Sequence, residues 1–195
     1  MDDIVIAAMR KWPRVPHCYG WLGLDERGRW YMRDDRAQAA GAFTSGAPGA
    51  KGSLLRHEKL VDFIHRNYAA DAEGCWYFQN GPQRVYVELE ATPIVWRIEA
   101  LDRVVAHTGR ASGPVRRCLT DETGRVYLEC TQGLGIVHPQ DMIHVADALE
   151  AGCWPLEEIR RAQLPQLGPF VPSPASSSAA RAGAVERRAW SRCRG

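Results

Sequence analysis

The histidines and cysteines are the residues best suited to chemistry in this sequence of 195 residues. A catalytic cysteine needs a neighbouring base and a lowered pKa. His17 and Cys18 are adjacent on a predicted strand, which points their side chains to opposite faces. A catalytic dyad must therefore form across the fold, and His17, Cys75 and Cys118 are its candidates. An enzyme with such a dispersed site is one functional hypothesis.

Two groups of side chains have spacings that bear on metal binding. His57 and His65 are two helical turns apart, about 11 Å, which is too far for both to hold one ion. Asp141 and His144 share a helical face, but the helix dipole alone also favours an acidic residue in a first turn. Cys-x-x-Cys, P-loop, Gly-x-Ser-x-Gly and Gly-x-Gly-x-x-Gly motifs are absent from the sequence. We therefore predict no metal and no cofactor, and we favour a protein that is not an enzyme.

A phrase of the form Asp-x-x-Gly-x-(Trp/Val)-Tyr occurs three times, at residues 25–31, 71–77 and 121–127. Its aspartate can accept backbone N–H bonds at the start of a type I turn, and its glycine supplies the positive φ that closes a hairpin. The aromatic residues then open the returning strand. The phrase predicts three β-hairpins, which we interpret as an old duplication rather than as an active site.

The second copy of the phrase is followed by a polar turn that the other copies lack. Residues 79–84 read Gln-Asn-Gly-Pro-Gln-Arg, and Asn-Gly is typical of a tight hairpin. Alternation in the next strand predicts a polar outer face that includes Tyr86 and Glu88. Polar side chains beside aromatic rings are typical of recognition surfaces, although turn geometry alone also explains this composition. The candidate surface for a small ligand or a protein partner comprises Trp30, Arg33, Trp76, Gln79, Asn80, Gln83, Arg84 and Tyr86.

The elements that position these residues indicate an α+β fold. Strands with period-two alternation and the three hairpins predict a mainly antiparallel β-sheet built from repeated hairpin units with a few interleaved helices. Apolar stripes at helical spacing predict helices near residues 2–12, 53–68, 139–150 and 155–164, of which the second is capped by Ser53.

Composition divides the chain into three parts. Residues 1–99 hold two repeat units and form a predicted N-terminal subdomain. Residues 100–165 hold the third unit and two short helices, and they form a smaller subdomain. Residues 166–195 are rich in proline, serine, alanine and arginine, so we predict a disordered tail. The pattern leaves open whether the repeats share one core.

Charge and hydropathy limit the partners. The net charge is +2, and residues 171–195 carry five arginines and one glutamate, so the folded part has no basic field for a dedicated nucleic-acid binder. Weak nucleic-acid association through this tail is an alternative hypothesis. No apolar run is long enough to span a membrane, and the beginning of the chain does not match a signal peptide, so we predict a cytoplasmic protein with free thiols. An exposed hairpin edge also permits a homodimer.

Four segments carry a resemblance to known families: Leu-Asp-Glu-Arg-Gly-Arg-Trp at 24–30, Lys-Leu-Val-Asp-Phe-Ile-His-Arg at 59–66, Asp-x-x-Gly-x-Trp-Tyr-Phe at 71–78, and Gln-Arg-Val-Tyr-Val-Glu-Leu-Glu-Ala-Thr-Pro at 83–93. Their order resembles an uncharacterised family of small proteobacterial proteins, known as a domain of unknown function. It is also distantly similar to a second family of unknown function with repeated β motifs. The resemblance covers residues 1–150, implies an α+β fold and brings no catalytic residues. We expect a non-enzymatic module that binds a ligand or a protein, with a regulatory or signalling role.

Overall fold

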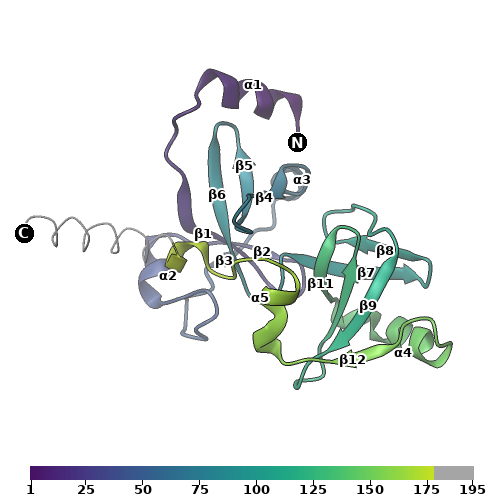
Figure 1. Cartoon of the computed structure of the whole chain (residues 1–195). Helices are drawn as coiled ribbons and strands as arrows, with labels where there is room; N and C mark the ends of the chain where they lie inside the picture. The colour runs from purple at the N-terminus through teal and green to yellow at the C-terminus, as the bar shows by residue number, and fades with distance from the viewer. Residues whose placement is uncertain (178–195) are drawn as a thin grey trace, which may run out of the picture.

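The computed structural model describes residues 1–177, which form two six-stranded β-sheets surrounded by short helices (Figure 1). The strands of the first sheet are β1 (Cys18–Leu24), β2 (Trp30–Met32), β3 (Ser53–Leu54), β4 (Tyr68–Ala70), β5 (Trp76–Asn80) and β6 (Gln83–Leu89). The strands of the second sheet are β7 (Ile94–Ala100), β8 (Arg103–Ala106), β9 (Val115–Thr120), β10 (Val126–Cys130), β11 (Gly133–Val137) and β12 (Leu156–Glu158).

The helices are short and lie around the sheets. They are α1 (Asp3–Lys11), α2 (Asp35–Ala40), α3 (Glu58–Arg66), the 3₁₀ turn η1 (Pro139–Asp141), α4 (Met142–Glu150), the 3₁₀ turn η2 (Arg161–Gln163) and α5 (Leu164–Leu167). Within residues 1–177, none of them is long and apolar enough to span a membrane.

The two sheets share an internal strand order. The first runs β3-β2-β1-β6-β5-β4, and the second, read in reverse, runs β8-β7-β11-β10-β9-β12. In each sheet a hairpin, β1–β2 or β7–β8, is joined to a three-stranded meander by a parallel pair, β1 with β6 or β7 with β11. Strands β1, β2, β4, β5 and β6 thus correspond to β7, β8, β9, β10 and β11.

The α+β class is confirmed, but both sheets are mixed. Seven of the ten strand pairs formed by the described residues are antiparallel and three are parallel, so the strands are mainly but not all antiparallel, and they form two sheets rather than one. A parallel pair needs a long connection, and the residues between β1 and β6 supply one through α2 and α3. Hairpin signals in the sequence are local. They do not reveal that β6 pairs with β1 or that β11 pairs with β7.

The three phrases form the turns between β1 and β2, β4 and β5, and β9 and β10. In each turn one oxygen of the phrase aspartate accepts the backbone N–H groups two and four residues later, at distances between 2.8 and 3.1 Å. The phrase glycines Gly28, Gly74 and Gly124 have φ of 76, 79 and 77°, a conformation that favours glycine. The turn chemistry inferred from the phrase is therefore present in all three copies.

Two predicted helices are wrong in part because sheet edges compete for their residues. Ser53 does not cap a helix: it lies in β3, which pairs with β2, and α3 begins at Glu58 with His57 as its cap. The helix expected at residues 155–164 is replaced by β12, which pairs with β9, followed by η2. The short helix α2 was not predicted, although its cap Asp34 accepts the N–H of Ala37 at 2.9 Å.

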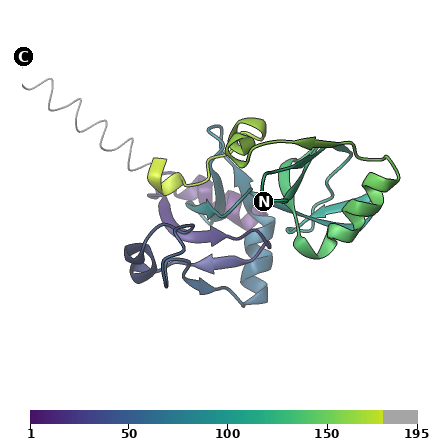
Figure 2. The same cartoon turned by 90° about the horizontal axis from the view of Figure 1, so that it is seen from below.

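Residues 161–177 form a C-terminal strap that returns from the second sheet to the first. Figure 2 shows this yellow-green segment running along one side of the two sheets. The Val171 N–H donates to Gly74 O at 3.0 Å, and the Leu89 N–H donates to Pro172 O at 2.9 Å. The prediction of disorder is therefore wrong for residues 166–177, because Phe170 supplies apolar surface to the core. The remainder of that predicted tail, residues 178–195, lies outside the described residues.

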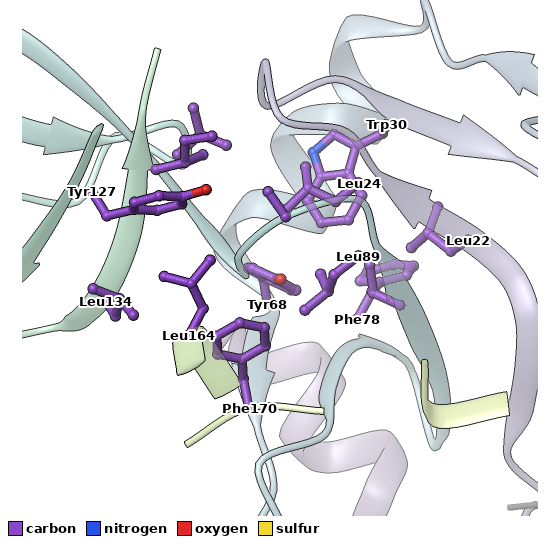
Figure 3. Close-up of a cluster of buried hydrophobic side chains, with 14 of the residues drawn as sticks. Leu22, Leu24, Trp30, Tyr68, Phe78, Leu89, Tyr127, Leu134, Leu164 and Phe170 are labelled. Carbon is purple, nitrogen blue, oxygen red and sulfur yellow. The ribbon is translucent and has the colours of Figure 1, made fainter. Parts of the chain in front are cut away.

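One apolar core joins the two sheets and the strap (Figure 3). Every side chain in it is 8% exposed or less. Its large members are Leu22, Leu24, Trp30, Tyr68, Phe78 and Leu89 from the first half, Tyr127 and Leu134 from the second sheet, and Leu164 and Phe170 from the strap. A second cluster lies between the second sheet and α4. The division of the chain at residue 99 stays a prediction, and β7 is already part of the second sheet.

Candidate functional site

Two members of the predicted recognition surface are interior residues. Trp30 is 1% exposed, and its indole N–H donates to Nε2 of His65 at 2.9 Å. Arg33 is 3% exposed, and its guanidinium donates to the carbonyls of Ala50 and Gly41 at 2.8 and 2.6 Å. Both side chains hold the fold together from inside and do not line a surface.

The members near the β5–β6 hairpin face in different directions. Trp76 is half-buried, and its ring lies 4.7 Å from that of Tyr68 on the core side of the sheet. Gln79 is 1% exposed, and its Nε2 donates to the carbonyl of Gly81 at 2.8 Å. Asn80 is exposed at the end of β5. Gln79 therefore serves the turn of the hairpin, and Trp76 packs toward the core.

Arg84 and Tyr86 contact two further aromatic residues, Tyr77 and Tyr19, on the outer side of the first sheet. The Arg84 guanidinium lies 4.4 Å from the ring centroid of Tyr77. The ring of Tyr86 stacks on that of Tyr19, with centroids 4.6 Å apart and an interplanar angle of 6°. Trp21 follows on β1 and is 41% exposed. We call Tyr19, Trp21, Tyr77, Arg84 and Tyr86 the open face.

The outward orientation predicted for Tyr86 and Glu88 does not leave them exposed. Tyr86 is 5% exposed because Tyr19 stacks over it, and Glu88 is 4% exposed because the strap covers it. The Glu88 carboxylate accepts the hydroxyl of Ser173 at 2.5 Å and the N–H of Ala175 at 3.1 Å. Gln83, the remaining predicted member, is half-buried and donates to the carbonyl of Pro16 at 2.9 Å, which fixes the segment that leads into β1.

The phrase that leads into β5 differs from its two counterparts in one hydrogen bond. In the first and third copies the phrase tyrosine donates its hydroxyl to the phrase aspartate: Tyr31 to Asp25 at 3.3 Å and Tyr127 to Asp121 at 2.7 Å. In the second copy the donor to Asp71 is Tyr86, from the next strand, at 3.0 Å. Tyr77 is released from the turn by this exchange, and its ring lies under Arg84 instead.

Burial and hydrogen bonds set the charges on the open face. Burial raises the pKa of Tyr86 to about 12, so its phenol is protonated at neutral pH and donates to Asp71. Burial acts to lower the pKa of Arg84, but its hydrogen bond with Tyr86 and the nearby Tyr77 and Asp71 raise that pKa overall, so Arg84 stays cationic. Burial and then the charge of Arg84 lower the pKa of His17, which lies edge-on to Tyr86.

The strand registers identify the residues of the second sheet that occupy the same positions. Tyr77, Arg84, Tyr86 and Trp21 correspond to Tyr127, Leu134, Ile136 and Val95. Those four residues of the second sheet are between 0 and 3% exposed, and all belong to the core shared with the first sheet. The same face of the same strand arrangement is therefore covered by protein in the second sheet and carries partly accessible Arg84 and Trp21 in the first.

The structure separates Cys118 from the other two residues considered for a dispersed catalytic site. His17 is exposed on the first sheet, whereas Cys118 is buried in the second, where burial raises its pKa to about 11 and keeps the thiol protonated. Cys75 is buried beside the tyrosines of the open face. Among residues 1–177, no three or more His, Cys, Asp or Glu side chains are placed to hold a metal ion. The arginines of the nucleic-acid hypothesis lie in residues 178–195, outside the described residues.

The sequence reasoning missed Tyr19 and Trp21. Both belong to β1, and the signal was their shared parity, which opposes them to Leu22 and Leu24, although the register of β1 shifts between Cys18 and Leu22. Only the parallel pairing of β1 with β6 brings that side next to Arg84 and Tyr86. This pairing has no local signature in the sequence.

A family model described as "Protein of unknown function (DUF2946)" matches residues 1–187. None of the curated proteins matches the chain. The crystal structure of a DUF1285 family protein from Silicibacter pomeroyi DSS-3 is similar to this structure, with a TM-score of 0.43 and 12% sequence identity over 65% of this chain and 68% of the other. The family model thus confirms the expected resemblance to a family of unknown function.

Proposed function

Because this chain belongs to a family described only as a protein of unknown function, membership brings no activity with it, and we propose that the protein is a non-enzymatic module that binds another protein through its open face. The single observation that carries this proposal is the contrast between two equivalent surfaces. Where the second sheet has Leu134, Ile136 and Val95 packed against protein, the first sheet has Arg84, Tyr86 and Trp21 on its outer side.

The residue types of the open face support a protein partner. Trp, Tyr and Arg are the residues most enriched among those that dominate the energy of protein interfaces. Tyr77 and Tyr86 are 6 and 5% exposed and form a rigid floor, over which Arg84, Tyr19 and Trp21 remain accessible in part. Rigid aromatic side chains lose little conformational entropy on binding, which favours their use as anchors.

The partner that fits this surface offers a carboxylate surrounded by apolar groups. The guanidinium of Arg84 already lies over Tyr77, so its plane is oriented before binding. A carboxylate can accept two parallel hydrogen bonds from it, while apolar groups cover Tyr19 and Trp21. Residues 178–195 of this chain contain five arginines and one glutamate, so charge complementarity favours a separate partner over this segment. A regulatory role is part of the proposal if docking changes the activity of that partner.

A charge-reversal experiment tests the proposed function. The full chain, Arg84→Glu and the control Arg103→Glu are each used to capture partners from cells that express the protein natively. Arg103 is exposed on the edge strand β8 and pairs with Glu99, so its reversal matches the charge change on a different surface. We expect a partner that binds the wild type and the control, and that binds Arg84→Glu at least about tenfold more weakly.

Three outcomes would count against this assignment. Equal capture by Arg84→Glu and the wild type would place the interface elsewhere. A partner that is a second copy of the chain, seen as a concentration-dependent dimer that Arg84→Glu disrupts, would make the open face a self-association surface. New binding that appears only after residues 178–195 are deleted would identify that segment as the natural occupant of the face.

A further inference from the structure

A cavity of about 370 Å³ lies where the strap crosses the end of β6, on the side of the sheet that also faces the loop after α2. Its walls come from three separate parts of the chain: residues 42–44, residues 88–91 and the strap. Its volume is within the range of small-molecule sites. The cavity is distinct from the open face, because none of the five open-face residues lines it.

The apolar walls of the cavity are held in fixed positions. Phe43 and Phe170 are 4 and 6% exposed and line it together with Leu89. The ring of Phe43 lies so close to Gly23 that a Cβ there would meet it at 2.5 Å, so β1 provides the floor on which that ring rests. Phe170 belongs to the core between the sheets (Figure 3). Two phenyl rings and a leucine thus offer a preformed surface for an apolar group.

Two of the three charged side chains in the lining are already committed to partners within the protein. The Glu88 carboxylate accepts Ser173 and Ala175 donors from the strap. Both carboxylate oxygens of Glu90 lie 2.9 Å from Nζ of Lys51, which neutralises that charge. Glu88 also interacts electrostatically with the buried Arg33, so both acidic groups have a cation within the protein.

Arg161 is the charged lining residue that still has N–H donors available for a ligand. One of its Nη2 hydrogens is donated to the backbone carbonyl of Glu90 at 3.0 Å, and among residues 1–177 its guanidinium forms no ion pair. A guanidinium has five N–H donors, so most of them remain for an acceptor in the cavity. An Arg beside two phenyl rings suits an anionic group attached to an apolar body.

We propose that this cavity is a binding site for a small organic carboxylate, whose carboxylate group contacts Arg161 and whose apolar body packs between Phe43 and Phe170. The strap supplies both Arg161 and Phe170, so the ligand would join the strap to the first sheet. This proposal does not depend on the open face, since it uses other residues on another part of the sheet.

Phenylacetate is the probe for this site, with phenylacetamide as its neutral analogue and phenethylamine as its cationic analogue. Binding to the full chain is measured by calorimetry and by the shifts of backbone amide resonances. We expect phenylacetate to bind with a dissociation constant in the millimolar range or below and to shift the amides of Leu89 and Phe170. The neutral analogue should bind about tenfold more weakly, because it loses the charge-assisted hydrogen bonds.

Two variants of Arg161 and one of its neighbour Arg160 make the test specific. Arg161→Gln should weaken phenylacetate binding at least about tenfold, whereas Arg161→Lys, which keeps the charge, should retain most of it. Arg160→Gln is the matched control, since Arg160 is its exposed neighbour and does not line this cavity. Amide spectra without ligand show whether the strap stays in place in Arg161→Gln; if it does not, the comparison of Arg161→Lys with Arg160→Gln decides.

Three results would overturn the proposal. Equal affinity of phenylacetate for Arg161→Gln, Arg160→Gln and the wild type would show that Arg161 does not recognise the carboxylate. Phenethylamine binding as tightly as phenylacetate, or phenylacetate failing to shift the amides around the cavity at millimolar concentration, would show that the site does not select an organic carboxylate.

Discussion

The two sheets share a strand order, but the same face is buried in the second sheet and partly exposed in the first. In the second sheet the face that carries the phrase tyrosine is apolar and packs against the first sheet, with Tyr127 0% exposed and bonded to Asp121. In the first sheet the equivalent Tyr77 lies beneath Arg84, and Tyr86 has taken over the bond to the phrase aspartate. Equivalent positions therefore became core in one sheet and an outer surface in the other.

This difference separates the residues that the fold requires from a residue that the fold does not explain. The aspartate and glycine of the phrase make the same turn in all three copies, so their presence reflects geometry. Arg84 in place of an apolar residue has no such explanation, because Leu134 fills the equivalent position and completes the same hairpin. A departure from a shared structural pattern is the reason to assign a function to Arg84.

Exchanging the side chains of Leu134 and Arg84, which occupy equivalent positions, should give the largest difference in unfolding free energy. Leu134→Arg places an uncompensated charge in the core between the sheets, so we expect a loss of more than about 4 kcal/mol in unfolding free energy, or no folded protein. Arg84→Leu should change it by less than about 1 kcal/mol, since Arg84 is only half-buried. Urea unfolding measures both. Similar losses in the two variants would remove the distinction between a covered and an open face.

Alanine substitutions at two phrase glycines should differ in unfolding free energy, because the strap packs against only one of them. At Gly124 a Cβ meets nothing within 4 Å, so Gly124→Ala carries only the cost of the left-handed backbone, about 1 kcal/mol. At Gly74 a Cβ would also meet the carbonyl of Pro169 at 2.8 Å, so we expect Gly74→Ala to cost about 3 kcal/mol. Thermal or urea unfolding distinguishes the two. Equal costs would mean that the strap yields freely at Gly74.

Removing the phrase hydroxyls should affect the second sheet more than the first. Tyr127→Phe deletes a buried donor to the Asp121 carboxylate, and we expect a loss of about 2 kcal/mol in unfolding free energy. Tyr77→Phe should cost less than about 0.5 kcal/mol, because in the described structure its hydroxyl does not serve the Asp71 turn. A large effect of Tyr77→Phe would contradict the exchange of donors between Tyr77 and Tyr86.

A smaller, pH-dependent contrast is expected between two histidines. Burial, and then the charge of His65, lowers the pKa of His107 from 6.5 to about 3 in the folded protein. The unfolded chain therefore binds the proton more tightly, so this contribution to stability is complete above pH 6.5 and is lost progressively as pH falls toward 3. We expect a loss of about 1 kcal/mol between pH 7 and 5.5.

The matched variants for this effect are His107→Gln and His17→Gln. Urea unfolding at both pH values should show a flatter pH dependence in His107→Gln and a smaller change in His17→Gln, because the pKa of the exposed His17 is lowered less than that of the buried His107. His107 accepts the N–H of Val95 through Nδ1 at 3.2 Å, and protonation would break that bond at the junction of the sheets. An unchanged pH dependence in His107→Gln would place the acid-sensitive group elsewhere.

The parts of the fold that depend on neighbouring residues were accessible from the sequence. The phrase turns follow from the hydrogen-bonding capacity of aspartate and the φ range of glycine, both of which act within five residues. The hairpin around Asn80 and Gly81 runs from Trp76 to Leu89, close to the predicted strands. The α+β class follows from the two periodicities of the apolar residues.

The parts that depend on distant segments were not accessible. Alternation along β6 separates its two faces but does not say that the strap will bury Glu88 or that Tyr19 will stack on Tyr86. Arginine is usually exposed, yet the five N–H donors of Arg33 allow it to bind clustered carbonyls in the interior, which its neighbours in sequence do not indicate. Four of the eight residues of the predicted surface are therefore buried, namely Trp30, Arg33, Gln79 and Tyr86, and the recognition role of the set stays a prediction.

Site-specific photo-cross-linking in cells tests the central claim most directly. A photoreactive phenylalanine analogue replaces Trp21 on the open face, and in a second protein it replaces Leu156 on the second sheet; the native residues are 41 and 44% exposed. We predict a discrete adduct with another protein from position 21, lost when Arg84→Glu is added, and none from position 156. No adduct from position 21, or an equal adduct from both positions, would contradict the assignment of the open face as a docking surface.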